Sequence, residues 1–166
     1  MSGPGTPALV ALAAAGVPHT VHAYHHDPAV SFGHSSGRSF GEEVATALNV
    51  SGAQVFKTLV ADVDGDLVVA VVPVAGSLDL KSLAAAVGGK RATMADVAAA
   101  ERATGYVVGG ISPIGQRRRL PTVVDSSALD YRTIYVSAGR RGLDVEIAAT
   151  DLVTLTGATM SPIAKS

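Results

Sequence analysis

The sequence predicts a mixed α/β domain built on a curled, barrel-like β-sheet with helices around it. Many short runs alternate apolar and polar residues, and a few helical segments interrupt them without the regular strand-helix-strand order of a parallel sheet. The 166 residues are enough for one domain with its own core, and neither an internal repeat nor a linker divides them. We therefore expect a single domain over residues 1–166.

The first third of the chain contains two predicted helices and one predicted strand. Apolar residues at helical spacing predict a helix that ends before Gly16, and alternation over 19–26 predicts a strand. Residues 27–38 contain Pro, Gly and Ser without a period, which indicates a loop. Ser39 with Glu42 three residues later matches a capping box, so a second helix should begin there and run to about residue 48.

The middle of the chain contains a predicted hairpin followed by two helices. Two apolar runs within 54–73 flank the sequence Asp64-Gly65-Asp66, which suits a tight turn between antiparallel strands. The next helix should end at Gly88. Thr93 and Asp96 repeat the capping pattern and predict that another helix begins there.

The last third is expected to return to strands and to end in a helix. Thr150 and Asp151 suit a helix start, and Gly157 marks where that helix should stop. A connection rich in Gly and Arg joins the last two strand candidates. The three strand candidates span 120–125, 133–137 and 143–148.

Lys57 stands on an apolar face of the predicted hairpin. Strand alternation places it on the same side as Val55, Leu59, Ala61 and Val63. Its ammonium group must therefore lie in a cavity, pair with a carboxylate, or extend along its own methylenes to water. The strand pattern alone leaves these three alternatives open.

Composition excludes several kinds of chemistry. Without cysteine the chain forms no disulfide and has no zinc-thiolate site or cysteine nucleophile, and no GxSxG elbow indicates a serine triad. Five histidines lie in the first 34 residues, but their spacing matches no closed metal motif, so we predict no metal. The net charge of -1 indicates no overall attraction to nucleic acid. No apolar stretch reaches the about 18 residues of a membrane span, so we expect a soluble cytoplasmic protein.

A glycine-rich loop at 105–115 precedes a run of arginines. Tandem Gly109 and Gly110 could aim backbone N–H groups at a carbonyl oxygen as an oxyanion hole does, or could simply form a bend between strands. The loop lacks the Walker lysine and the GxGxxG spacing, which argues against a nucleotide cofactor. If the two arginine-bearing turns meet, they would form a cationic rim for phosphates; the alternative is a solvated charge run. These arginines are Arg117, Arg118, Arg119, Arg140 and Arg141.

Together these segments resemble the YbaK family of bacterial aminoacyl-tRNA deacylases, which is related to the editing domain inserted in bacterial prolyl-tRNA synthetase. The resemblance runs through "HTVHAYHHDP", "FGEEVATAL", "VFKTL", "PVAGSLDLKSLA", "MADV", "TGYVVGGISPIGQRRRLPTVVD" and "IYVSAGRRGLDVEIAATDL". The loop at 29–38 is longer than the family's usual connection. The resemblance implies a barrel-like mixed sheet, no cofactor, and a pocket in which Lys57 of "FKT" is indispensable. Matching motifs place Tyr24, Phe40, Thr58, Gly110, Ser137 and Asp144 around that pocket.

The activity implied by the resemblance is cleavage of the ester of mischarged Cys-tRNA(Pro). The substrate's own thiol attacks its ester carbonyl, which explains how the reaction proceeds without a protein cysteine. Lys57 and the Gly110 N–H would stabilise the carbonyl oxygen, Ser137 and Asp144 would orient the amino group or ribose, and the arginines would hold the acceptor stem.

Two alternatives and one further partner remain open. The enzyme could act on Ala-tRNA(Pro) or another aminoacyl-tRNA with water as nucleophile. The chain could instead be a non-catalytic module that binds tRNA or a synthetase. The sequence leaves open whether the protein docks on prolyl-tRNA synthetase as a partner. No membrane partner is expected.

Overall fold

The largest sheet of the protein is mixed, with antiparallel and parallel pairs. The computed structural model describes residues 5–25 and 40–166. In the strand order β5-β2-β3-β6-β9, the first two pairings are antiparallel and the last two are parallel. These strands are β5 (Ala92–Met94), β2 (Phe56–Val63), β3 (Asp66–Pro73), β6 (Thr122–Asp125) and β9 (Thr159–Ser161).

A second, antiparallel sheet has the order β1-β8-β7, and an irregularity between Ser137 and Arg140 interrupts its β7–β8 pairing. An isolated bridge between Val55 and Tyr135 joins it to the end of β2. The mixed α/β class is therefore confirmed, whereas the described ladders form separate sheets and a barrel-like closure stays a prediction. The remaining strands are β1 (His19–Ala23), β7 (Ile134–Arg140), β8 (Leu143–Ile147) and the pair β4 (Ser77–Leu78) and β10 (Ala164–Lys165).

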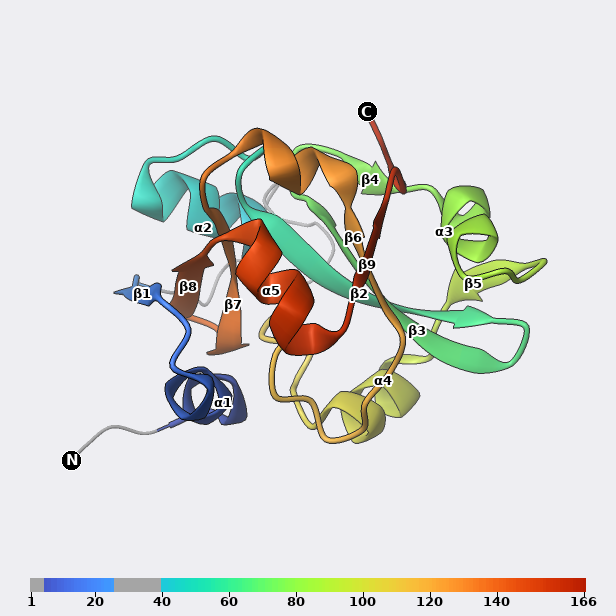
Figure 1. Ribbon diagram of the computed structural model, residues 1–166, viewed down its shortest axis with the longest axis horizontal. Helices are drawn as coiled ribbons and strands as arrows, with labels where there is room; N and C mark the ends of the chain where they lie inside the picture. Colours follow the sequence, from blue (N-terminus) through green and yellow to red (C-terminus); the bar gives the residue numbers. More distant parts are fainter. Residues whose placement is uncertain (1–4, 26–39) are drawn as a thin grey trace.

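The helices surround these sheets and are short (Figure 1). None of the helices in the described ranges is long and apolar enough to cross a bilayer. They are α1 (Pro7–Ala15), α2 (Phe40–Leu48), α3 (Leu80–Ala86), α4 (Val97–Thr104), α5 (Ala149–Thr156) and the 3-10 turn η1 (Ser126–Asp130).

The predicted helix ends are confirmed more often than the predicted starts. Gly16 is left-handed at φ 66° and ends α1, and Gly157 at φ 71° ends α5. The start predicted at Thr93 is wrong, because Thr93 pairs with β2 and the Asp96 side chain caps α4. The final helix begins at Ala149, one residue before the predicted start at Thr150, and no side chain caps it. The predicted cap Ser39 and the loop at 27–38 lie outside the described residues.

The predicted hairpin forms and supplies the centre of the core. Asp64 and Gly65 have φ of 52° and 96°, the positive values that a two-residue hairpin turn of the primed type requires. The run 68–72 on β3 is buried on both faces, because one face packs toward β7 and β8 and the other toward α3. The end of β2 farthest from the turn is thereby held beside the second sheet, where Lys57 lies.

Candidate functional site

A cavity of about 440 Å³ opens between β2 and the second sheet. Its walls come from β2, the segment joining β5 to α4, the glycine-rich loop, and β7 and β8. The structure brings five residues predicted from the sequence to this one cavity: Tyr24, Lys57, Thr58, Ser137 and Asp144.

Lys57 is the cation of the cavity. It is the second residue of β2 and lies opposite Val72 of β3. Its Nζ donates to the carbonyl oxygen of Gly76 at 3.1 Å, which uses one of three ammonium protons. Burial lowers the pKa of Lys57 below its usual value, and the charge of Glu42 partly opposes that shift. Of the three alternatives for the Lys57 side chain, the structure therefore shows the first: the side chain is half-buried at the wall of a cavity.

Asp144 is the buried acid of the cavity. Its side chain is 3% exposed, and within the described ranges no hydrogen bond reaches its carboxylate. Burial raises the pKa of Asp144 to about 7. Ser137 lies opposite it in the β7–β8 ladder. Because a buried carboxylate without a partner is costly, this acid is suited to a cationic or hydrogen-bonding ligand.

Two further polar side chains complete this wall. Burial raises the pKa of Tyr24 to about 12, so its phenol stays neutral and able to donate a hydrogen bond at physiological pH. Thr58 Oγ1 is the buried side-chain oxygen that lacks a hydrogen-bond partner in the part of the chain that the structure describes. An unsatisfied buried hydroxyl costs free energy, so its place on a cavity wall indicates a ligand contact.

The glycine-rich loop is fixed to the cavity by hydrogen bonds at Val108. The Val108 N–H donates to Glu101 Oε2 at 2.8 Å, and Arg141 Nη2 donates to the Val108 carbonyl at 2.7 Å. A Cβ on Gly110 would lie 2.7 Å from the Cα of Arg140, so only glycine lets the loop pack on the β7–β8 turn. This contact confirms that the loop and the later arginine turn lie together.

The predicted role of the Gly110 N–H is not supported by this geometry. That N–H already donates to the carbonyl oxygen of Val107 at 2.8 Å. Gly110 is buried and is absent from the cavity wall, which Gly109 lines instead. Gly110 therefore positions the loop, and its N–H group is used within the loop instead of pointing to a ligand in the cavity.

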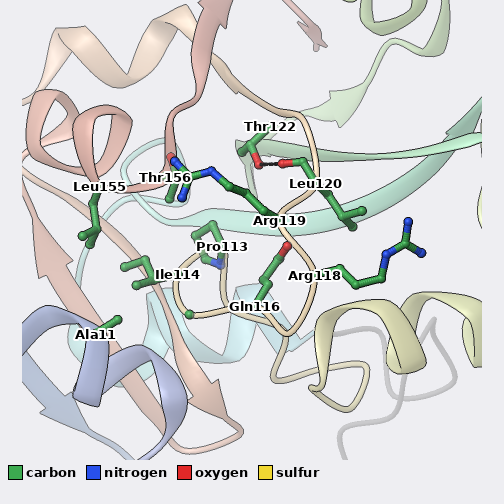
Figure 2. Close-up of a pocket in the computed structure, with 11 residues that line it drawn as sticks. Ala11, Pro113, Ile114, Gln116, Arg118, Arg119, Leu120, Thr122, Leu155 and Thr156 are labelled. Atoms are coloured by element: carbon green, nitrogen blue, oxygen red, sulfur yellow. Dashed lines mark hydrogen bonds between the residues drawn. The ribbon is translucent and has the colours of Figure 1, made fainter.

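The two arginine groups lie at different places around the glycine-rich loop, and a single cationic rim stays a prediction. Arg118 and Arg119 line a second cavity of about 220 Å³, which shares no lining residue with the first. Figure 2 shows Arg119 extending toward Thr156 at the end of α5, while Arg118 points away from it. Arg117 packs beside Gly105 at the end of α4. Arg140 and Arg141 lie beside Gly110 and Val108, in the part of the loop that borders the first cavity.

Some of the remaining predicted residues lie outside the part of the chain that the structure describes. Phe40 begins α2, but its side chain lies outside the described residues, as do His26 and His34. His22 pairs with Glu146 at 3.0 Å on the second sheet. In the described ranges no three His, Asp or Glu side chains gather at one point that could hold a metal ion.

Comparison with known proteins identifies the family of this chain. A family model, the aminoacyl-tRNA editing domain, matches residues 34–155. The chain belongs to this family. EbsC of Enterococcus faecalis, a proposed Cys-tRNA(Pro)/Cys-tRNA(Cys) deacylase, is 40% identical over 134 residues, which cover 80% of this chain and 81% of EbsC. The resemblance to YbaK-type deacylases is thereby confirmed.

Two solved structures share the fold. One is a proposed trans-editing enzyme for prolyl-tRNA synthetase, with a TM-score of 0.81 and 22% identity over 99% of this chain and 100% of the other. The second is a hypothetical protein with a TM-score of 0.82 and 23% identity over 96% and 100% of the two chains. At such identities the match establishes the mixed α/β fold of the editing family.

Sequence reasoning missed the apolar wall of the first cavity. That wall forms where β5, α4 and the glycine-rich loop meet. Strand β5 has only three residues, too few for a period to be visible, and it occupies the segment assigned to a helix start. Exposed apolar residues at the start of a helix are the one signal that could have indicated it. The wall consists of Met94, Ala95, Val97, Ala100, Val108 and Ile111.

Proposed function

We propose that this member of the editing family is a trans-editing deacylase that removes cysteine from mischarged Cys-tRNA(Pro). The observation that carries the proposal is the meeting of three groups at one cavity: the Lys57 ammonium, and the Asp144 carboxylate and Thr58 hydroxyl, which have no hydrogen-bond partner among the described residues. The description of EbsC supports the choice of cysteine and of the proline tRNA. Editing of this kind is needed because a synthetase pocket cannot strongly reject an amino acid of nearly the same size and shape.

Lys57 is the proposed electrostatic centre of the reaction. Gly76 accepts one ammonium N–H, so in the part of the chain that the structure describes two N–H groups remain for the ester carbonyl oxygen and for the terminal ribose or phosphate. Negative charge grows on that carbonyl oxygen in the transition state, and a fixed cation in a partly dry site stabilises it. Thr58 Oγ1 takes the second donor role that the Gly110 N–H cannot fill.

Asp144 is the proposed partner of the substrate's α-ammonium group. A bound cation favours the carboxylate form and therefore lowers the raised pKa of Asp144, so the substrate recruits its own counter-ion. Ser137, opposite Asp144, and the neutral phenol of Tyr24 are placed to hydrogen-bond the ribose. These contacts would fix the aminoacyl group in the geometry that its intramolecular reaction needs.

The proposed reaction uses the substrate's thiol as nucleophile. The thiol loses its proton, and its sulfur forms a bond to the ester carbonyl carbon. The bond from that carbon to the ribose oxygen then breaks, and the oxygen takes up a proton to become the free hydroxyl of the tRNA. The products are a cyclic cysteine thiolactone and deacylated tRNA, and no protein side chain is consumed.

Release of labelled amino acid from Cys-tRNA(Pro) tests the proposal. Purified protein should release the label, and the first product should be the thiolactone, which hydrolyses to cysteine. Alanine has no thiol, so equal release from Ala-tRNA(Pro) would show that water is the nucleophile and that the enzyme accepts a broader class of aminoacyl-tRNA. Binding of tRNA with every ester left intact would refute the enzyme and favour a non-catalytic binding module.

The arginines are proposed to hold tRNA at two places. Arg140 is exposed and has no side-chain partner in the described residues, and its backbone packs on the loop that borders the first cavity. It is therefore placed for the phosphates nearest the ester. Arg118 and Arg119, at the second cavity, would contact a more distant part of the tRNA. Docking on prolyl-tRNA synthetase is a separate proposal, which co-purification of the two proteins would test.

A further inference from the structure

The ammonium group of Lys57 is held by a backbone carbonyl from outside the cavity wall. Gly76 accepts from Lys57 Nζ at 3.1 Å, and it is not among the described residues that line the first cavity. A lysine side chain is a long flexible stem, so the direction of its ammonium depends on the acceptor that it meets. Whatever fixes the Gly76 carbonyl therefore also directs the Lys57 ammonium.

Strand β10 packs directly against Gly76. A Cβ on Gly76 would lie 2.8 Å from the carbonyl oxygen of Lys165, so the two backbones are in close contact. Strand β4 begins at the residue after Gly76 and pairs with β10, which runs beside it (Figure 1). The Asp79 N–H extends this pairing, because it donates to the carbonyl oxygen of Ile163 at 2.8 Å.

The pairing of β4 with β10 is too short to hold itself in place. Each strand contributes two residues, and even a complete two-stranded hairpin is only marginally stable in water. Ile163 is fully buried in the core and fixes the segment before β10 from one side. The backbone of the segment needs a second attachment, since its N–H groups are strong donors that must be satisfied.

Asp125, at the end of β6, supplies that attachment and is 5% exposed. Its Oδ1 accepts from the N–H groups of Ile163 at 2.8 Å and Ala164 at 2.9 Å. Its Oδ2 accepts from the N–H and the hydroxyl of Ser127, at the start of η1. Burial opposes the charge, but these four hydrogen bonds outweigh it and lower the pKa of Asp125, so the carboxylate stays ionised at neutral pH.

We propose that Asp125 is a positioning residue for Lys57: it fixes β10 against Gly76, whose carbonyl directs the ammonium. Asp125 is not among the described residues that line the first cavity, so it acts through β10 and the Gly76 carbonyl. The effect on turnover rests on the proposed deacylase function, whereas the effect on the direction of the ammonium does not. A small misplacement of a group that stabilises the transition state is enough to slow a reaction strongly.

The first variant, Asp125→Ala, removes the attachment of β10. It leaves the N–H groups of Ile163 and Ala164 without their acceptor. The matched control is Ser127→Ala, which removes the hydroxyl that donates to the other oxygen of the same carboxylate and keeps the contacts of Oδ1.

The second variant, Gly76→Ala, acts at the other end of the connection and keeps Asp125. The new Cβ would push the Lys165 carbonyl away, whereas the φ of Gly76 is not positive and suits alanine. The matched control is Gly52→Ala in the segment beside the same turn, because a Cβ there would lie 3.6 Å from Ala75, an ordinary contact.

The first measurement does not depend on turnover. The chain has four lysines, so protein labelled with ¹³C at lysine Cε gives a simple ¹³C–¹H spectrum, and the signal lost in Lys57→Arg identifies Lys57. The Lys57 signal should move in Asp125→Ala and in Gly76→Ala and should stay in place in both controls.

The second measurement is the rate of cysteine release from Cys-tRNA(Pro). Both variants should lose at least about tenfold in kcat with a smaller change in KM, because the ammonium acts mainly on the oxygen that becomes charged in the transition state. The controls should release cysteine at the natural rate.

An unmoved Lys57 signal in the folded variants would overturn the inference, and so would equal movement in the controls or a raised KM with kcat unchanged. Should Asp125→Ala fail to fold, Gly76→Ala with its control decides the question in the same way. A Lys57 signal that moves as expected, in a protein whose natural form releases no cysteine, would refute the deacylase and keep the role of Asp125 in directing Lys57.

Discussion

Replacing Asp144 with Asn should make the protein more stable and less active. Asp144 is 3% exposed, has no hydrogen-bond partner within the described residues, and has a pKa raised by burial to about 7. In the unfolded chain its pKa returns to about 3.9. The difference of about 3 corresponds to about 4 kcal/mol that folding must supply to keep the carboxylate charged.

The pH range of this cost follows from the two pKa values. Below about pH 4 the carboxyl group is protonated in both states and costs nothing. Between pH 4 and about 7 the unfolded chain releases its proton first, so the free energy of unfolding falls. Above pH 7 the whole cost is present. Asn has no proton to release, so the variant should gain stability relative to the natural protein across this window, up to about 4 kcal/mol at pH 8.

Urea unfolding at pH 4, 6 and 8 measures this gain. Asp130→Asn is the matched control, because Asp130 is exposed on η1 and should change stability little at any pH. A stability difference between Asp144→Asn and the natural protein that does not change with pH would refute the electrostatic reasoning. The same variant should lose deacylase activity, since a neutral amide pairs poorly with an α-ammonium group.

Four other predictions concern the same site and its surroundings. Lys57→Ala should abolish release of cysteine without loss of folded structure in circular dichroism, and release at the natural rate would defeat the mechanism. Thr58→Val keeps the shape of the side chain and removes a buried hydroxyl that has no hydrogen-bond partner in the described residues, so it should raise stability by about 1 kcal/mol. It should also reduce kcat, because this hydroxyl is the proposed second donor to the ester oxygen. Gly110→Ala should cost about 1–3 kcal/mol through collision with Arg140, measured by thermal unfolding, and a neutral effect would contradict the close packing. Arg140→Ala should raise KM for both full-length tRNA and an aminoacylated trinucleotide, whereas Arg119→Ala should raise it for the full-length tRNA only; identical effects of the two changes would refute separate contacts.

Periodicity predicts the β2–β3 hairpin well, because its residues repeat the pattern that packing imposes. The run 68–72 is apolar on both faces and is buried on both faces, and Asp64-Gly65 provides the turn. The short strands β4, β5, β9 and β10 have two or three residues each, so no period can be visible in them. They exist because neighbouring strands and tertiary contacts hold them, which is information that no local window contains.

The residues of the candidate site were predicted far better than their contacts. Matching motifs identified Tyr24, Lys57, Thr58, Ser137 and Asp144, and these do line one cavity. The motifs could not reveal that Val107 already accepts the Gly110 N–H. They also could not separate the two arginine groups, because the direction of a side chain after a glycine-rich loop depends on how that loop packs.

The polar wall of the cavity combines three groups that each weaken the folded state. Among the described residues, the buried Asp144 carboxyl group and the Thr58 hydroxyl have no hydrogen-bond partner, and Lys57 is partly removed from water. A fold selected for stability alone would replace them with apolar residues, as it does along the buried middle of β3. Under the proposed function, an aminoacyl ester would bring an ammonium group for the acid, and a carbonyl oxygen for the hydroxyl and the lysine. Binding of such an ester would then recover part of the free energy that these groups cost the folded protein, which links the expected stability of each variant to its expected activity.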